Sequence, residues 1–147
     1  MVRKGGCQCG QIWFEMVGEL GQASICHCRM CQKAYGNFFA PLVSIKAGTL
    51  KWTKAEPSRF ESSNFVRRGF CEKCGTPLTY ESPESTSISI SAFDHPENIE
   101  PIIQYGVEAR LSYLGNLKDW PEHRTSDFFE EAPYLKNMAS FQHPDED

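Results

Sequence analysis

Alternating apolar and polar side chains along short stretches predict a chain built mainly from β-strands. In residues 11–17, Ile12, Phe14 and Met16 occupy every second position, which is the period of a half-buried strand. Residues 87–91 alternate serine with isoleucine and give the clearest strand signal. Further strands are expected over 38–45, 50–53, 59–62 and 65–70, and a short helix over 29–34 that ends near Gly36.

Proline and glycine recur too often along the chain for long helices to form, with 9 prolines and 11 glycines in 147 residues. This length favours one domain, and 40% apolar with 23% charged residues is typical of a globular fold. We therefore predict a single mainly β domain over residues 1–135. Residues 136–147 are polar and acidic, and we expect them to form a frayed tail.

The charge balance argues against a nucleic-acid partner. Fifteen Lys and Arg stand against nineteen Asp and Glu, for a formal net charge of -4, whereas nucleic-acid binders usually carry a basic face. No apolar stretch is long enough to span a membrane, and the charged start is not followed by the apolar segment of a signal peptide. We expect a cytoplasmic protein with neither a nucleic-acid nor a membrane partner.

Seven cysteines, an odd number, are the most informative residues, and each has another cysteine two or three positions away. Reducing conditions in the cytoplasm disfavour disulfides, so closely spaced cysteines there more often bind metal. Cys9 and Cys74 are each followed by glycine, which adopts at least steric cost the positive φ that a tight metal-binding turn needs. The groups are Cys7 with Cys9, then Cys26, Cys28 and Cys31, then Cys71 with Cys74.

The spacing suggests two zinc ions with different roles. A structural zinc site is closed by four protein ligands, whereas a catalytic zinc usually has three and keeps one position open. The two flanking pairs supply four thiolates for a structural zinc: Cys7, Cys9, Cys71 and Cys74. The compact triplet supplies three for a catalytic zinc: Cys26, Cys28 and Cys31.

Other divisions of the same cysteines stay open at this stage. Cys26 and Cys28 could join the pair Cys71 and Cys74 in the closed site, which would leave the remaining three apart. One closed zinc site could also stand beside three inert cysteines. Thiolates hold iron–sulfur clusters as well as zinc.

Polar residues near the triplet have plain as well as functional interpretations. His27 lies between two predicted ligands, and in an extended segment its side chain points away from them, so we expect it to pack or to face solvent. Arg67 and Arg68 fall on opposite faces of a predicted strand. At most one of them can reach a site, and we expect both to be solvated.

Three motifs carry a family resemblance: Gly-Cys-Gln-Cys-Gly at 6–10, Cys-His-Cys-Arg-Met-Cys-Gln-Lys at 26–33 and Phe-Cys-Glu-Lys-Cys-Gly at 70–75. In this order and spacing they resemble the glutathione-dependent formaldehyde-activating enzymes, a family that also contains centromere protein V. The resemblance extends from about Gly5 to Pro121.

The resemblance implies an Mss4-like fold, similar to the zinc-binding Rab-GTPase chaperones, with small antiparallel sheets around structural zinc. It also implies structural zinc on the outer four cysteines and catalytic zinc on the central three. The implied activity is a carbon–sulfur lyase of the S-(hydroxymethyl)glutathione synthase type. Its partners would be a small-molecule thiol such as glutathione and a small aldehyde such as formaldehyde. In that case Arg29 and Lys33 could pair with the thiol's carboxylates.

The chain departs from the family pattern outside the metal motifs. Gln104 stands where many members have His, Tyr113 where an aromatic residue that is usually Trp ends the segment, and Asp119-Trp120-Pro121 where an Asp-x-Leu-Pro-like sequence is common. These changes bear on substrate choice rather than on the fold. The sequence offers no convincing general base, so the alternative is a non-catalytic zinc module that acts as a thiol carrier or a protein-interaction domain.

Overall fold

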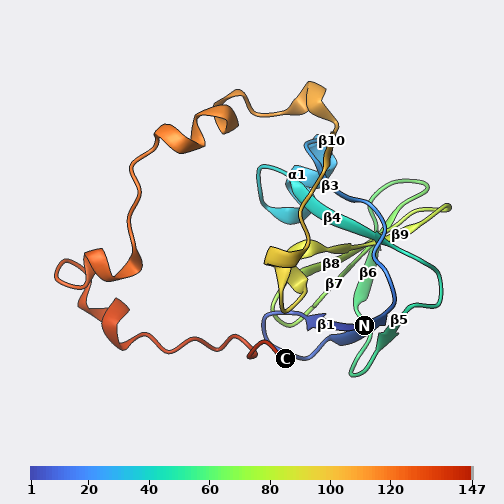
Figure 1. The fold of residues 1–147 in the computed structure, drawn as a ribbon, viewed down its shortest axis with the longest axis horizontal. Helices are drawn as coiled ribbons and strands as arrows, with labels where there is room; N and C mark the ends of the chain where they lie inside the picture. The colour runs from blue at the N-terminus through green and yellow to red at the C-terminus, as the bar shows by residue number, and fades with distance from the viewer. Residues whose placement is uncertain (147) are drawn as a thin grey trace. The chain divides into compact units, whose positions relative to one another are not determined.

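The computed structural model describes residues 1–146, over which ten strands and one α-helix are joined by turns and short 3-10 helices (Figure 1). The prediction of a mainly β fold with few short helices is confirmed. The helix α1 covers Arg29–Tyr35. The strands are β1 (Val2–Gly6), β2 (Trp13–Val17), β3 (Ala23–Cys26), β4 (Ala40–Ile45), β5 (Leu50–Trp52), β6 (Ser58–Glu61), β7 (Arg67–Phe70), β8 (Pro77–Glu81), β9 (Thr86–Ser89) and β10 (Ile103–Tyr105).

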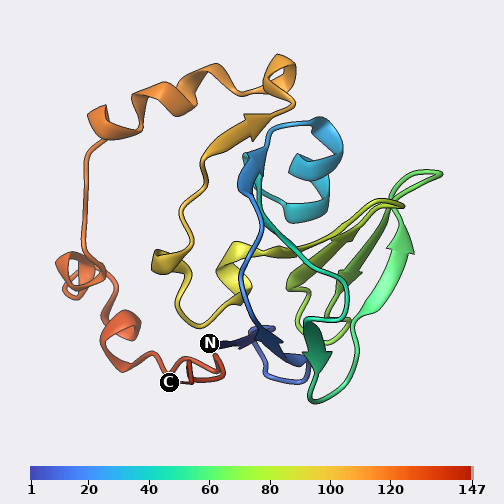
Figure 2. The same cartoon turned by 45° about the vertical axis from the view of Figure 1, so that its right-hand side comes forward.

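The strands form two sheets. The smaller has the antiparallel order β1-β2-β5, and the larger has the order β10-β3-β4-β9-β8-β7-β6. Neighbours in the larger sheet are antiparallel except at one edge, where β10 runs parallel to β3. Figure 2 shows α1 following β3 and lying close to β10.

The main core lies where β2 packs against residues of the larger sheet. The alternation in β2 points Phe14 and Met16 inward, and both side chains are fully buried. The Phe14 ring meets the rings of Trp52 and Phe93 edge-on, with centroids 5.7 and 5.1 Å apart. Two cysteines, Cys7 and Cys71, belong to the same buried cluster.

The sequence pattern predicted some elements and missed others. The helix expected over 29–34 is α1, and it ends at Gly36, which has left-handed backbone angles. The strand expected over 87–91 stops at Ser89, because the next residues turn into the 3-10 helix η1 (Ile90–Ala92). Four strands had no clear signal in the sequence: β1, β3, β8 and β10.

Contacts within the chain define two units. The first contains Met1–Arg110 together with the segment that begins at Gln142. It also includes the 3-10 helices η2 (Pro96–Asn98) and η3 (Val107–Ala109). The second, Leu111–Phe141, consists of turns and the 3-10 helices η4 (Ser112–Asp119), η5 (Thr125–Phe128) and η6 (Pro133–Asn137). The boundaries expected at 135 and 136 stay a prediction.

The segment that begins at Gln142 packs against the start of the chain (Figure 1). The backbone N–H of Glu146 donates to Asp94 Oδ2 at 2.8 Å, and its carboxylate lies 3.0 Å from Lys4 Nζ. The backbone N–H of His143 donates to the carbonyl of Gln8 at 2.8 Å. The described residues at this end of the chain are therefore held by backbone and side-chain contacts.

Candidate metal centres

Four cysteines from two distant parts of the chain meet in one group, which we call the four-cysteine group: Cys7, Cys9, Cys71 and Cys74. Their sulfurs all lie within 4.8 Å of one another. The distance between Cys7 Sγ and Cys9 Sγ is 3.6 Å, and that between Cys9 Sγ and Cys71 Sγ is 3.8 Å. The group joins the segment after β1 to the turn between β7 and β8.

Two tight turns present these sulfurs. The N–H of Gly10 donates to the carbonyl of Cys7 at 3.1 Å, and the N–H of Gly75 donates to the carbonyl of Cys71 at 2.7 Å. Both glycines have positive φ, +78° and +84°, which confirms the expectation from the sequence. Each turn thus closes over its first cysteine and directs both of its thiols to one side.

Thr76 connects the two turns. Its hydroxyl oxygen accepts from the N–H of Gln8 at 3.0 Å and lies 3.3 Å from Cys74 Sγ. Burial raises the pKa of Cys7 to about 12. At Cys74 burial acts in the same direction, but hydrogen bonds from the Thr76 hydroxyl and from the backbone outweigh it and lower the pKa to about 6. Hydrogen bonds within the group therefore favour the thiolate form of Cys74.

The remaining cysteines form the three-cysteine group: Cys26, Cys28 and Cys31, again with all sulfurs within 4.8 Å. Cys26 ends β3, Cys28 is the residue that caps the start of α1, and Cys31 lies in the first turn of that helix. Cys28 Sγ accepts from the N–H of Cys31 at 3.4 Å. The short helix therefore fixes the spacing of the second and third sulfurs, and β3 fixes the first.

The three sulfurs differ in environment. Cys31 is 2% exposed, while Cys26 and Cys28 are partly exposed. A hydrogen bond from Cys31 lowers the pKa of Cys26 to about 5, and the same bond, together with burial, raises the pKa of Cys31. The group is thus reachable from solvent on the side of Cys26 and Cys28 and closed on the side of Cys31.

Arg68 lies next to Cys31, the buried member of the three-cysteine group, and is 3% exposed. Its Nη2 donates to Cys31 Sγ at 3.4 Å, its Nε donates to Ser62 Oγ at 2.8 Å, and its guanidinium lies 5.0 Å from the centre of the Tyr80 ring. The expectation that both arginines would be solvated is wrong for this one. Strand alternation places Arg67 outside and Arg68 inside, beside its cross-strand partner Tyr80.

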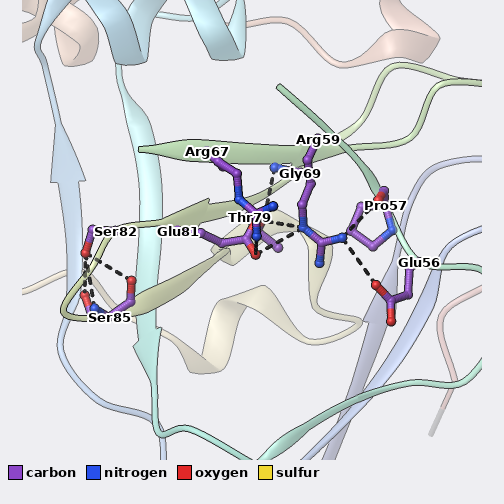
Figure 3. Close-up of polar contacts among 9 residues, drawn as sticks. All are labelled: Glu56, Pro57, Arg59, Arg67, Gly69, Thr79, Glu81, Ser82 and Ser85. Carbon is purple, nitrogen blue, oxygen red and sulfur yellow. Dashed lines mark hydrogen bonds and ion pairs between the residues drawn. The ribbon is translucent and has the colours of Figure 1, made fainter. Parts of the chain in front are cut away.

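Arg67, on the outer face, belongs to a separate polar network. Its Nη2 lies 3.8 Å from Glu81 Oε1, and Figure 3 shows it beside Arg59, whose Nε donates to both oxygens of Glu81. The N–H of Gly69 donates to Thr79 Oγ1 at 2.8 Å, next to an irregularity in the pairing of β7 with β8 (Figure 3). The two neighbouring arginines therefore have different partners: Arg67 pairs with Glu81 on the outer face, and Arg68 contacts Cys31 inside.

The edge strand β10 and the turn after it cover the loop of the three-cysteine group. The N–H of His27 donates to the carbonyl of Tyr105 at 2.8 Å. Gly106 follows with φ of +63° and lies so close to Cys28 that an added Cβ would be 2.8 Å from the Cys28 nitrogen. Gln32 is buried and donates to the carbonyls of His27 and Ala109, at 2.8 and 3.1 Å.

His27 is packed inside the protein and does not face solvent, in agreement with the first of the two expectations from the sequence. It is 1% exposed, its Nε2 lies 2.8 Å from Gln104 Oε1, and its ring meets Phe39 edge-on at 5.7 Å. Gln104, noted above as a departure from the family pattern, is therefore the polar partner of a buried histidine. Neither residue is part of the group of sulfurs.

Two residues suggested as partners for substrate carboxylates lie on exposed positions of α1. Arg29 Nη1 donates to Gln32 Oε1, and Lys33 is exposed. Tyr35, which the sequence suggested as a wall of the site, packs against the small cluster that contains Cys31, and buried Gln32 is the neighbour that the sequence did not single out. Tyr35 donates or accepts a hydrogen bond with Ser89 Oγ at 2.7 Å, and burial raises its pKa to about 12.

Both groups have the chemistry of metal sites. Thiolates at this mutual spacing suit zinc and other soft ions, and local turns or a helix start already bring the sulfurs together. Cys31 has a buried cation beside it, and Cys7 Sγ accepts from the N–H of Ile12 at 3.3 Å, so negative charge on either group is compensated by donors. The two groups could therefore hold metal ions.

The fold and the two cysteine groups define a mainly β protein with two candidate metal centres. Residues 2–108 match the family described as glutathione-dependent formaldehyde-activating enzyme. The match covers both cysteine groups and most of the chain, so the chain belongs to this family.

Two known proteins are similar to parts of the chain. An uncharacterized lyase from Schizosaccharomyces pombe is 27% identical over 77 residues, which is 52% of this chain and 56% of that protein. The chain thus matches only a little over half of the length of that relative. A crystal structure of a Rhodobacter sphaeroides protein superposes with a TM-score of 0.55 at 16% identity, over 69% of this chain and 98% of the other, and supports the fold.

Among the helices of the described residues, none has the length and apolar character that crossing a membrane requires.

Proposed function

We propose that the chain is a zinc-dependent carbon–sulfur lyase of the S-(hydroxymethyl)glutathione synthase type. Glutathione or a related thiol binds at the three-cysteine group and forms an adduct with formaldehyde or a similar small aldehyde. The observation that carries the proposal is the pairing of a complete group of four sulfurs with an incomplete group of three, in a chain of this family.

The two groups have separate roles in this proposal. The four-cysteine group, Cys7, Cys9, Cys71 and Cys74, closes a structural zinc site. Cys26, Cys28 and Cys31 hold the catalytic zinc, which gives two zinc ions per chain. Zinc held by these three cysteines would supply an open coordination position at which the pKa of a bound thiol is lowered, so that a nucleophilic sulfur would be present at neutral pH.

The residues of the chain position and enclose this chemistry. Partial exposure of Cys26 and Cys28 leaves a side by which a thiol reaches the group, and the buried Cys31 anchors it to the core of the larger sheet. In the reaction, the thiol sulfur forms a bond to the carbonyl carbon of the aldehyde. The proton lost by the thiol ends on the former carbonyl oxygen, so the product is a hydroxymethyl thioether and no oxidant or reductant is needed.

A cytoplasmic setting is part of the proposal. All seven cysteines, which lie within the described residues, are free thiols, and a reducing compartment keeps such thiols available for metal.

Exchange of formaldehyde between its free form and the glutathione adduct tests the activity. Exchange spectroscopy by NMR measures the rate directly at equilibrium, with the zinc-loaded protein, with the Cys28→Ala variant and without protein. We expect the wild type to accelerate exchange and Cys28→Ala to leave it at the spontaneous rate. A wild type that leaves exchange at the spontaneous rate would rule out the synthase.

A thiol carrier is the second candidate, and one observation favours it. Among the described residues near the three sulfurs, Arg68 is a cation, and burial raises the pKa of the Tyr35 and Tyr80 phenols, so both stay protonated at neutral pH and accept no proton. A carrier needs no general base. It would bind glutathione at the three-cysteine group without accelerating exchange, so the same experiment with a parallel binding titration separates the two.

A further inference from the structure

Arg68 is the most deeply buried cationic side chain that the structure places near either cysteine group. It is 3% exposed, and its Nη1 atom is buried without a hydrogen-bond partner within the described residues. Its other nitrogens contact Cys31 Sγ and Ser62 Oγ. A guanidinium removed from water in this way needs a compensating negative charge nearby.

The described part of the chain gives Arg68 no carboxylate partner. The ion pairs of residues 1–146 involve Lys4, Arg59, Arg67 and His123, with acidic partners on the surface or at Glu81. The face of the Tyr80 ring offers only the modest attraction of a cation–π contact. The acceptor that remains for the buried charge is the sulfur of Cys31, at 3.4 Å from Nη2.

We propose that Arg68 is the counter-ion of the three-cysteine group and a positioning residue for its metal and for the incoming thiol. A divalent ion held by three thiolates carries one net negative charge, which the guanidinium neutralises. An arriving thiolate then meets a neutral assembly instead of an anionic one. The site is thereby tuned to take an anionic sulfur ligand in its open position.

This inference rests on the proposed function, because it assigns a role at the same site. It also adds a feature that the cysteine motif alone does not contain, namely the positive charge of Arg68, which reduces the repulsion between the group and a fourth thiolate. The arrangement is built rather than incidental. Arg68 is held by a hydrogen bond to Ser62 and by packing on its cross-strand neighbour Tyr80, in addition to its contact with Cys31.

The test uses Arg68→Met, which keeps much of the length and apolar volume but removes the charge, and Arg68→Lys, which keeps the charge. Arg67→Met is the matched control, since the neighbouring arginine lies on the outer face with Glu81. Cobalt(II) is titrated into each full-length protein in which the four-cysteine group is already filled with zinc. The sulfur-to-cobalt absorption bands report binding at the three-cysteine group.

We expect Arg68→Met to weaken cobalt binding by about 10–100-fold, the usual effect of losing a side chain that supports metal ligands. Arg68→Lys should recover most of the affinity, and Arg67→Met should match the wild type. Added glutathione should change the cobalt spectrum of the wild type at a lower concentration than that of Arg68→Met. Retained zinc and an unchanged melting curve show that the variants are folded.

Three results would overturn the inference. Folded Arg68→Met with wild-type affinity for cobalt and for glutathione removes the role of the charge while leaving the proposed function intact. Folded Arg68→Lys that is as weak as Arg68→Met shows that shape rather than charge matters. A folded wild type that binds no cobalt at the three-cysteine group overturns both this inference and the proposed function. If Arg68→Met does not fold, the comparison of Arg68→Lys with the wild type decides.

Discussion

The four-cysteine group and the three-cysteine group are held by the chain in different ways. Cys7 and Cys71 are part of the main buried cluster, together with Phe14 and Leu78. The three-cysteine group belongs to a smaller cluster at one edge of the larger sheet, where Cys31 packs with Ala40 and Leu42. The first group therefore ties together segments on which the whole core depends. The second is anchored to the fold but is not needed to complete it.

This contrast agrees with the proposal that the four-cysteine group stabilises the fold and the three-cysteine group carries the chemistry. Each group has two partly exposed cysteines, so exposure does not distinguish them. They differ in their buried members, because displacing Cys7 or Cys71 disturbs the main core, whereas displacing Cys31 disturbs only the smaller cluster. The number of sulfurs in each group and the place of each group in the fold both favour a structural role for the four-cysteine group and a catalytic role for the three-cysteine group. Variants that affect one group and spare the other can break or sharpen this comparison.

The largest effect is expected from Cys74→Ser. Structural zinc on four thiolates contributes on the order of 10–16 kcal/mol, while a domain of ordinary size has a net stability of about 5–15 kcal/mol. Cys74→Ser should therefore abolish cooperative folding, measured by thermal melting and by dispersion of the amide NMR signals. A soluble Cys74→Ser protein with a cooperative melt near that of the wild type would contradict a structural role for this group.

The next effect is expected from Gly106→Ala, which acts on the other group. An alanine Cβ would lie 2.8 Å from the nitrogen of Cys28, and positive φ adds about 1–2 kcal/mol of strain for a residue with a Cβ. We expect the loop of the three-cysteine group to shift and its metal affinity to fall by about tenfold or more, the range seen when support of a ligand is lost. Cobalt titration measures this change.

Gly36→Ala is the matched control for Gly106→Ala. Gly36 also has positive φ, +56°, but nothing lies within 4 Å of an added Cβ. Both variants carry the strain of a positive φ, but only the Gly106→Ala side chain would displace Cys28. Equal loss of cobalt affinity in the two variants would show that strain in the chain, and not displacement of Cys28, is responsible.

A smaller effect is expected from Gln104→Leu. Its side-chain oxygen is the partner of buried His27, and leaving that ring nitrogen without a partner costs about 1–3 kcal/mol. Because His27 lies between Cys26 and Cys28, the loss should fall on the three-cysteine group and lower its cobalt affinity, with zinc kept at the four-cysteine group. Gln104→His, which can still hydrogen-bond, should be milder. If both variants bind cobalt like the wild type, the pair does not support the loop.

The smallest effect is expected from His143→Ala, near the four-cysteine group. The His143 ring packs on Trp13 with centroids 4.3 Å apart and lies against Gly10, beside Cys9. We expect a loss of about 0.5–1.5 kcal/mol of stability, the range for an aromatic pair. Zinc should also leave this group faster in the presence of a chelator. Phe141→Ala, at a position that is 93% exposed, is the control and should change neither quantity.

The sequence predicted the parts of the site that depend on local spacing. Cysteines two or three positions apart meet readily through a turn or a helix start, so the two pairs, the triplet and the helix after Cys28 could be inferred. Gly10 and Gly75 were predictable for the same reason, because a tight turn after a metal-binding pair needs positive φ. The joining of Cys7 and Cys9 with Cys71 and Cys74 was favoured by the sequence, but other divisions stayed open. The mainly β fold followed from alternation and from the frequency of proline and glycine.

The parts that depend on pairing between distant segments could not be predicted. The inward position of Arg68 follows from which face of β7 meets Tyr80 on β8, and alternation alone left both faces possible. The parallel pairing of β10 with β3 joins residues far apart in the chain, and it is this pairing that brings Gln104 to His27 and Gly106 to Cys28. A single sequence contains no local signal for such contacts.

The central claim is the division of seven cysteines into a closed group and an open one, and metal content per chain tests it most directly. Zinc is measured by atomic emission in purified wild type and in Cys28→Ala, together with the melting curve of each. The account predicts two zinc ions per wild-type chain and one in Cys28→Ala, with the cooperative melt kept. A wild type that holds a single zinc, or a Cys28→Ala variant that loses both ions and unfolds, would contradict it.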